Sequence, residues 1–298
     1  MTHSTHQHIG VLGLGNLGLP CAANLLKAGY TVYGYRRGDM AAFEKLGGIA
    51  CTSPSDLASR CSVVIELLPG VDGLEECIWG TSGLLAGAKP GLILLNLAGY
   101  GAELKLRVQQ ALAAQGALMV EGAVSGPPEM MAAKKATFFL AGDEDLVNNL
   151  QPLVDDLTGS SFYLGSFGAA IKAKLVANLL VAVHNAAAAE ALALGTRAGL
   201  DGGLLLKILG ASAGNSSVLG YKAPRMLAQD YLPAAGSFHS LEKHTLLAKS
   251  LGDSTGTQTP LLDTAMALYR HADDLGRREH DIAAVFDWIA TFNPKETT

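Results

Sequence analysis

The chain has 298 residues, of which 49% are hydrophobic and only 16% charged, and its formal net charge is −5. This length allows two domains with a large core. We do not expect nucleic acid as a partner, because no basic run could follow a phosphate backbone. The four cysteines form no CxxC pair and the N-terminus has no secretory pattern, so we expect a soluble, cytoplasmic protein.

The N-terminal part begins with an apolar strand at residues 8–12, and the sequence GLGNLG, a helix and a second strand at residues 30–35 follow it. This order is the phosphate-binding unit of a dinucleotide-binding fold. The first two glycines permit a tight turn and a close approach of the pyrophosphate, and the third lets the helix pack on the strand. We therefore expect cofactor contacts at Gly13, Gly15, Asn16, Leu17 and Gly18.

The end of the second strand indicates which cofactor is bound. Enzymes that use NAD place an acidic residue there, where it holds the ribose hydroxyls. This chain has no acidic residue between Gly18 and Gly38, and it carries Arg36 and Arg37 instead. A guanidinium attracts a 2′-phosphate. The sequence therefore predicts NADP(H) in preference to NAD(H), although a solvated strand end is the alternative.

Alternating strands and helices continue to residue 164, with apolar strands that end near residues 68, 98 and 124. Continuously apolar strands separated by helices predict a parallel sheet covered on both faces, with ligands beyond the carboxyl ends of its strands. We expect cofactor contacts there from Leu68, Pro69 and Ala98. Ser125 and the Gly126 amide could hold a carboxylate, or they could form an ordinary Ser-Gly turn.

A long apolar segment at residues 165–200 predicts a central helix, buried on nearly every face. Its polar residues Lys174, Asn178 and Asn185 fall within roughly a 40° arc, whereas Lys172 points to the other side. A buried ammonium is costly, so Lys174 is either a desolvated lysine that exchanges a proton or a lysine that snorkels to solvent. The pattern of the helix alone leaves both interpretations open.

The remainder of the sequence is helical, and Lys243 on one of these helices is by itself typical of a solvated surface. Neither a metal-binding spacing nor a GxSxG nucleophile motif is present in the sequence. The predicted fold class is α/β: an N-terminal, doubly wound Rossmann-type sheet over residues 1–164, followed by an all-helical domain over residues 165–298 that the central helix enters.

These features together resemble the β-hydroxyacid dehydrogenases, which include 3-hydroxyisobutyrate dehydrogenase and tartronate semialdehyde reductase. The resemblance covers essentially the whole chain. GLGNLGLP at residues 13–20 is similar to the family's cofactor loop GLGxMGxP, and EGAVSG at residues 121–126 is similar to its substrate loop DAPVSGG. The family's glycine turn before a catalytic lysine, with an asparagine four residues later, matches the run from Gly165 to Asn178.

The resemblance implies roles for several side chains. Lys174 would exchange the substrate proton and Asn178 would orient it, while Ser125, Gly126 and Lys243 would bind the acid group of a small hydroxy acid or its semialdehyde or oxo acid. Arg36 and Arg37 resemble the Asn-Arg of members that use NADP. Departures from the family pattern, which put the usual substrates in doubt, occur at Glu121, Ala123, Pro127, Ala170, Ala98 and His244.

Two alternatives to a hydroxyacid dehydrogenase remain at this point. One is an imine reductase-like enzyme that uses NADPH, for which the altered positions Ala98 and Pro127 leave room. The other is a catalytically silent NADP-binding interaction protein, although such a protein would be expected to lose Lys174 or Ser125. The apolar central helix further predicts a homodimer or homotetramer, because one small helical domain covers it poorly.

Overall fold

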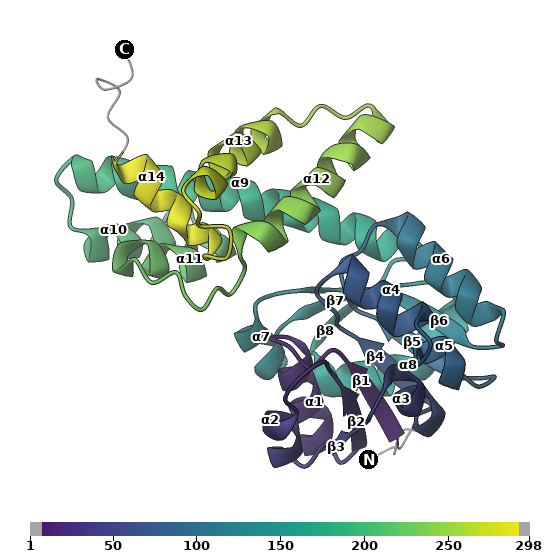
Figure 1. The fold of residues 1–298 in the computed structure, drawn as a ribbon. Helices are drawn as coiled ribbons and strands as arrows, with labels where there is room; N and C mark the ends of the chain where they lie inside the picture. Colours follow the sequence, from purple (N-terminus) through teal and green to yellow (C-terminus); the bar gives the residue numbers. More distant parts are fainter. Residues whose placement is uncertain (1–7, 292–298) are drawn as a thin grey trace. The chain divides into compact units, whose positions relative to one another are not determined.

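The computed structural model describes residues 8–291, apart from the side chains of residues 272–274, and it divides into two compact units at Lys174/Leu175 (Figure 1). The first unit contains all eight strands of the described chain, together with eight helices. Its strands are β1 (His8–Leu12), β2 (Thr31–Tyr35), β3 (Ile49–Ala50), β4 (Val63–Glu66), β5 (Ile93–Asn96), β6 (Leu118–Ser125), β7 (Thr137–Ala141) and β8 (Ser160–Tyr163). Its helices are α1 (Gly18–Lys27), α2 (Ala41–Lys45), α3 (Pro54–Arg60), α4 (Val71–Trp79), α5 (Leu84–Gly87), α6 (Ala102–Ala113), α7 (Pro128–Ala132) and α8 (Glu144–Leu157).

The strands form one sheet in the order β3-β2-β1-β4-β5-β6-β7-β8. The prediction of a parallel sheet is wrong at one place, because β7 runs antiparallel to β6. The connection between them, residues 126–136, contains only the five-residue α7. A parallel crossover needs a dozen or more residues, usually with a longer helix. This connection therefore returns the chain in the opposite direction, and β8 then pairs parallel to β7.

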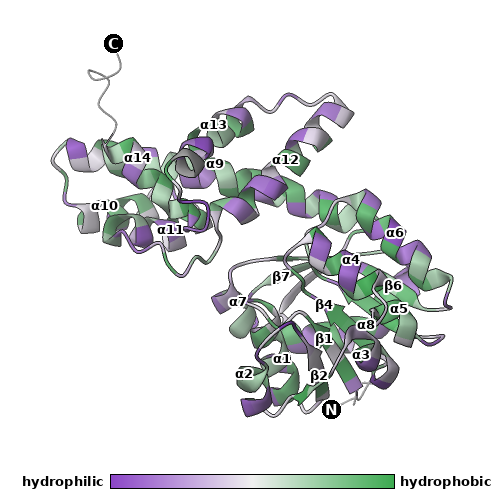
Figure 2. Cartoon of the chain, viewed as in Figure 1, coloured by the Kyte–Doolittle hydropathy of each residue, from purple (hydrophilic) through white to green (hydrophobic). Residues whose placement is uncertain are grey.

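Hydrophobic layers cover both faces of the sheet, as the doubly wound prediction requires. On one face, Ile9 and Val11 of β1 join residues of α1 and α8, and on the other, Leu12 joins residues of α3, α4 and α6. Figure 2 shows the inner strands mostly in the green of hydrophobic residues. The four free cysteines all belong to this unit, and Cys61 is half-buried while the other three are buried.

A row of residues crosses the sheet at the carboxyl ends of the parallel strands. Leu12 of β1 is in register with Glu66 of β4, which is in register with Asn96 of β5, and Asn96 is in register with Glu121 of β6. All four are buried, although three of them are polar. Buried polar groups require hydrogen-bond partners. The buried polar side chains of Glu66, Asn96 and Glu121 therefore lie together at this edge of the sheet.

The long helix α9 (Ala169–Arg197) begins in the first unit and continues into the second. Within the single chain, several apolar side chains of α9 stay uncovered: the exposed fractions are 57% for Val176, 49% for Leu180 and 74% for Leu194. Among the described residues, α9 is the one helix long and apolar enough to cross a membrane, a test that core helices of soluble proteins also pass. The amide of Asn185 binds the Tyr269 hydroxyl at 3.1 Å and the Ile282 carbonyl at 2.9 Å, so this polar residue links α9 to its own unit.

The second unit is helical throughout its described residues. Besides α9 it contains α10 (Gly202–Ala211), α11 (Ser217–Ala228), α12 (Phe238–Thr255), α13 (Pro260–Asp274), a 3₁₀ turn η1 (Ile282–Ala284) and α14 (Val285–Thr291). Predicted and observed helices agree in order and approximate position. Pro260 stands at the start of α13, where its missing N–H costs nothing.

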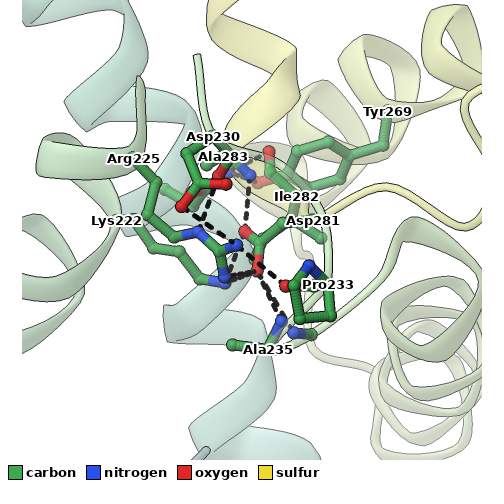
Figure 3. Close-up of polar contacts among 11 residues, drawn as sticks. Lys222, Arg225, Asp230, Pro233, Ala235, Tyr269, Asp281, Ile282 and Ala283 are labelled. Carbon is green, nitrogen blue, oxygen red and sulfur yellow. Dashed lines mark hydrogen bonds and ion pairs between the residues drawn. The ribbon is translucent and has the colours of Figure 1, made fainter. Parts of the chain in front are cut away.

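A buried carboxylate, Asp281, joins the helices of the second unit (Figure 3). It accepts hydrogen bonds from the Lys222 ammonium at 2.6 and 2.7 Å and from the Arg225 guanidinium at 3.2 Å. Its remaining donors are three backbone amides, those of Ala235, Gly236 and Ala283, at 3.0–3.2 Å. Asp281 therefore ties α11 and η1 to the segment that leads into α12.

Candidate active site

The glycine loop after β1 has the shape that a pyrophosphate needs. Gly13 adopts φ +98°, which disfavours any side chain. A Cβ at Gly18 would lie 1.7 Å from the Gly13 carbonyl oxygen, so this helix start permits only glycine, whereas a Cβ at Gly15 would meet no atom within 4 Å. Among the described residues, no side chain caps α1, although the Leu19 amide already donates to the Gly15 carbonyl at 3.0 Å and Pro20 has no N–H. Gly13, Gly15, Asn16, Leu17 and Gly18 thus fit the phosphates of a dinucleotide.

Two exposed arginines follow β2, and they lie differently. The Arg36 guanidinium donates to the Leu14 carbonyl at 3.1 Å, which holds it beside the glycine loop. Arg37 forms an exposed ion pair with Glu76 of α4 at 3.2 Å. Arg36 is therefore the better placed of the two to meet a phosphate next to this loop.

A cluster around Glu66 shapes the loop after β4, where Leu68 and Pro69 are the predicted cofactor contacts. The Glu66 carboxylate accepts a hydrogen bond from the Leu68 amide at 2.6 Å and another from the Asn96 side-chain amide. The Tyr100 hydroxyl lies 3.2 Å from Glu66 Oε1 and donates to the Leu68 carbonyl at 2.6 Å. Burial raises the pKa of Tyr100, so its hydroxyl stays a donor. Glu66 and Tyr100 therefore hold the backbone of this loop at Leu68. Ala98, the third predicted contact, lies buried just after β5.

The predicted substrate loop is formed where β6 ends at Ser125. Ser125 is half-buried, and its backbone is still paired with Thr137 of β7. Gly126 follows with φ +139°, and a Cβ there would come within 3.3 Å of Met130. Glycine is therefore the one residue that adopts the backbone conformation at position 126 without strain.

Lys174 lies in the first turns of α9, three residues beyond Ile171. The residue as a whole is half-buried, and burial lowers the pKa of its ammonium group to about 8 from an ordinary 10.5. Among the two interpretations left open by the sequence, this favours a desolvated lysine over one that reaches solvent. Lys172, two residues earlier, is exposed.

The start of α9 is attached to β6 by the buried Glu121. Its carboxylate accepts hydrogen bonds from the backbone amides of Gly168 and Ile171, the latter at 3.0 Å. The Lys105 ammonium of α6 lies 4.0 Å from Glu121 Oε1 and donates to the Gly122 carbonyl at 2.6 Å. The strand that ends in Ser125 and the helix that carries Lys174 are therefore joined inside one unit.

The other two predicted site residues belong to the second unit. Asn178 is buried one helical turn after Lys174 on α9, as the spacing predicts. Lys243 is half-buried on α12, whose first turn is capped by the Ser237 hydroxyl. The backbone of α12 is held at its start by bonds from the Phe238 and His239 amides to the carbonyls of His280 and Arg278. Asn185, which shares the face of Lys174 in the helical projection, has a structural role between α9, α13 and η1.

Several polar groups that support these positions were not predicted as such. Glu121 was noted only as a departure from a motif, and Lys105 has the sequence context of a solvated helix residue. Glu66 and Asn96 each interrupt an apolar strand at its last position, and this is a signal that sequence inspection can use. The partners of Glu121 lie 47 and 50 positions later in the chain, a separation at which local patterns give no information.

Known proteins match the chain over both units. Residues 8–165 match the family model of the NAD binding domain of 6-phosphogluconate dehydrogenase. Residues 168–289 match the model described as NAD-binding of NADP-dependent 3-hydroxyisobutyrate dehydrogenase.

Individual relatives extend over nearly the whole chain. L-threonate dehydrogenase of Cupriavidus necator is 32% identical over 94% of this chain and 95% of its own length. NAD-dependent L-serine dehydrogenase of Pseudomonas aeruginosa is 30% identical over 94% of this chain and 96% of its own. The solved structure of 3-hydroxyisobutyrate dehydrogenase from Salmonella typhimurium has the same fold, with a TM-score of 0.87 at 24% identity, covering 94% of this chain and 99% of that one.

Proposed function

Because the chain belongs to the β-hydroxyacid dehydrogenase family, and is thus an oxidoreductase acting on CH–OH groups, we propose that it interconverts a small hydroxy acid and its semialdehyde or oxo acid. NADP(H) is the preferred cofactor, and Lys174 donates or accepts the substrate proton. The observation that carries this proposal is Lys174 itself: its pKa is lowered by burial to about 8, and it lies on a helix fixed to the strand of Ser125.

The lowered pKa suits Lys174 to both directions of the reaction. NADP(H), held at the glycine loop, would supply the hydride in reduction and accept it in oxidation. Below pH 8 the Lys174 ammonium is mostly protonated and can donate a proton to the oxygen of a carbonyl. Above pH 8 the amine is mostly neutral and can take the proton from a hydroxyl. A lysine with its ordinary pKa of 10.5 would be a poor base at neutral pH.

The remaining predicted residues bind and orient the substrate. Ser125 and the Gly126 amide receive the acid group, and Lys243 supplies a positive charge to it. Asn178, one turn from Lys174, holds the lysine and the substrate hydroxyl in line. Support for the substrate class comes from the family, whose members named above act on small hydroxy acids.

Arg36 supports the preference for NADP(H). It lies beside the glycine loop, and no acidic residue follows β2 before Asp39. Membership of the family does not decide the cofactor, since one relative is by name NAD-dependent. We expect Arg36→Ala to raise the KM for NADPH about tenfold or more and to leave the KM for NADH nearly unchanged.

Arg37→Ala is the matched control for that variant, because Arg37 is already paired with Glu76. Steady-state kinetics with both cofactors measures the two KM values. Equal losses for NADPH and NADH, or a larger effect of Arg37→Ala, would contradict the assignment of Arg36 to the 2′-phosphate.

The first experiment is NADPH oxidation against a panel of small semialdehydes, 2-oxo acids, 3-oxo acids and cyclic imines. We expect turnover of acidic carbonyl compounds that Lys174→Ala abolishes while NADPH binding stays nearly intact. Lys172→Ala is the matched control, since Lys172 is an exposed lysine on the other side of the same helical turn. Turnover of imines alone would favour the imine reductase alternative, and full activity of Lys174→Ala would refute the proton-transfer role.

We further propose a homodimer or homotetramer in the cytoplasm. The exposed side chains of Val176, Leu180 and Leu194 on α9, with Leu204 and Ile208 on α10, support a second copy as the cover. Free cysteines support a reducing compartment. Light scattering of the purified protein tests the assembly, and a monomer at micromolar concentration would contradict it.

A further inference from the structure

We propose that Glu121 is a positioning residue for the reaction: with Lys105 as its buried counter-charge, it fixes the first turn of α9 and thereby the height of Lys174 above the sheet. This inference rests on the proposed function of Lys174. It assigns a role to two buried charges that are not among the proposed cofactor and substrate contacts.

The geometry places Glu121 at a junction of three elements. Its backbone lies in the interior of the sheet, in register with Asn96 of β5 and Ala141 of β7. Its side chain is fully buried and binds the amide of Gly168, the residue just before α9, and that of Ile171 in the first turn of α9. Lys174 follows Ile171 by three residues, less than one helical turn. A shift of the carboxylate therefore moves the segment that carries the lysine.

The chemistry of a helix start explains why a carboxylate stands here. The first amides of an α-helix have no partner within the helix, and burial makes that lack costly. A carboxylate can accept from two amides at once, and its charge complements the positive end of the helix dipole. A glutamine of the same length has one accepting oxygen and an NH₂ group, which would face one of these N–H donors.

The length of the side chain matters as well as its charge. The family motif that this loop resembles has the shorter Asp at this position, whereas this chain has Glu. An aspartate on the same strand position is one methylene shorter. It would reach both amides only if the first turn of α9 moved toward β6.

Lys105 makes the buried carboxylate tolerable and anchors the same strand. Its ammonium is fully buried, lies 4.0 Å from Glu121 and donates to the carbonyl of the next residue, Gly122. A buried charge without a counter-charge is strongly destabilising. Lys105 thus binds the backbone of β6, while Glu121 binds the start of α9.

The test compares Glu121→Gln and Glu121→Asp with the full-length wild-type protein. We expect kcat to fall about 10- to 100-fold in Glu121→Gln, because a displacement near 1 Å has an effect of this size on catalysis. The KM for NADPH stays within about twofold, since the glycine loop is untouched. Glu121→Asp keeps the charge and gives an intermediate loss.

A second readout follows Lys174 directly and needs no substrate. The pH dependence of Lys174 acylation, followed by mass spectrometry, reports the pKa of this amine. We expect that pKa to rise from about 8 in Glu121→Gln, because a displaced first turn exposes the ammonium to water. A merely structural role of Glu121 would lower the stability of the protein without this shift.

Two control variants separate positioning from stability. Ser53→Ala removes the cap of α3 in the same unit, and Leu150→Ala opens the core under α8. Both destabilise the unit without changing a residue of α9 or β6, so both are expected to keep the wild-type kcat and the wild-type Lys174 pKa. Losses of kcat equal to that of Glu121→Gln in these controls would overturn the proposal.

The outcomes also distinguish this inference from the proposed function. If Lys174→Ala is inactive but Glu121→Gln has wild-type kcat and an unshifted Lys174 pKa, the role of Glu121 alone is refuted. If Lys174→Ala keeps its turnover, the proton-transfer role is refuted and the positioning role with it. Should Glu121→Gln not fold, Glu121→Asp decides by the same two readouts.

Discussion

The two units each contain a buried carboxylate paired with a buried lysine, and the two pairs are built differently. Asp281 has two cationic partners and three backbone amides, and it joins loops and helices of the second unit. Glu121 has two amides and one ammonium at 4.0 Å, and it holds a single helix start. Asp281 thus connects several segments of the second unit, whereas Glu121 sets the position of one helical turn.

The difference shows how similar groups serve stability in one place and function in another. Asp281 is saturated with donors, so its removal disturbs many contacts at once. Glu121 has few contacts, but they act within one turn of Lys174. We therefore expect substitution of Asp281 to cost mainly folding free energy, and substitution of Glu121 to cost turnover out of proportion to stability.

The largest expected effect is on the Asp281 side of this comparison. Asp281→Asn leaves Lys222 buried without its counter-charge, and breaking such a pair costs about 3–5 kcal/mol of the free energy of unfolding. Urea denaturation followed by circular dichroism measures it. A loss below about 1 kcal/mol would show that Asp281 does not organise the second unit.

Glu121→Gln also leaves a buried lysine, Lys105, without its counter-charge, and we expect a loss of about 3 kcal/mol, the lower end of the same range, because this pair is 4.0 Å apart and that of Asp281 is 2.6 Å apart. Lys105 keeps its bond to the Gly122 carbonyl in this variant, which limits the loss. The double variant Glu121→Gln/Lys105→Met removes both charges, so it should recover part of the stability but none of the turnover. If stability and turnover recovered together, Glu121 would act on turnover only through stability, as we expect for Asp281.

The pH dependence of the reaction sharpens the comparison further. Because burial lowers the pKa of Lys174 to about 8, the fraction of protonated Lys174 falls about tenfold per pH unit above that value. We expect kcat/KM for reduction to fall above pH 8 and that for oxidation to rise up to pH 8 and then level off. Initial rates between pH 6 and 10 in both directions measure this. Profiles that are flat through pH 8 would contradict Lys174 as the proton donor and acceptor.

The smallest expected effect concerns a half-buried cap. Ser237 accepts the Ser240 amide at 3.2 Å at the start of α12, the helix of Lys243. Ser237→Ala should cost about 0.5–1 kcal/mol of unfolding free energy, as for ordinary N-cap residues. Thermal unfolding checks this value. A loss as large as that of Asp281→Asn would place the anchor of α12 at Ser237 instead.

Most of the fold was predictable because its signals are local. The glycine loop, the arginines after β2 and the helical register of Lys174 and Asn178 each lie within a few residues of one another. The antiparallel β7 was missed because its direction depends on the length of one short connection. The composition of α9 predicts that its apolar faces are covered, but it does not say by which chain, and the single chain leaves part of these faces exposed.

The supporting part of the site was not predictable in the same way. Lys105, Glu121 and the amides of α9 come together from three distant segments, and Lys105 on its own is typical of a solvated helix face. Asp281 and Lys222 are 59 positions apart. Buried ion pairs of this kind depend on tertiary packing, which local propensity and spacing do not report.

The four buried or half-buried cysteines have a practical consequence for chemical labelling. Burial raises the pKa of Cys21 and Cys61 to about 12 and that of Cys51 and Cys77 to about 11, so almost no thiolate exists at neutral pH. We therefore expect the native protein to react slowly with maleimides and iodoacetamide, with the half-buried Cys61 the most accessible of the four. A cysteine introduced by Val176→Cys would be exposed and would react faster than the four native thiols. A fall in its labelling rate at rising protein concentration would show that a second molecule covers α9.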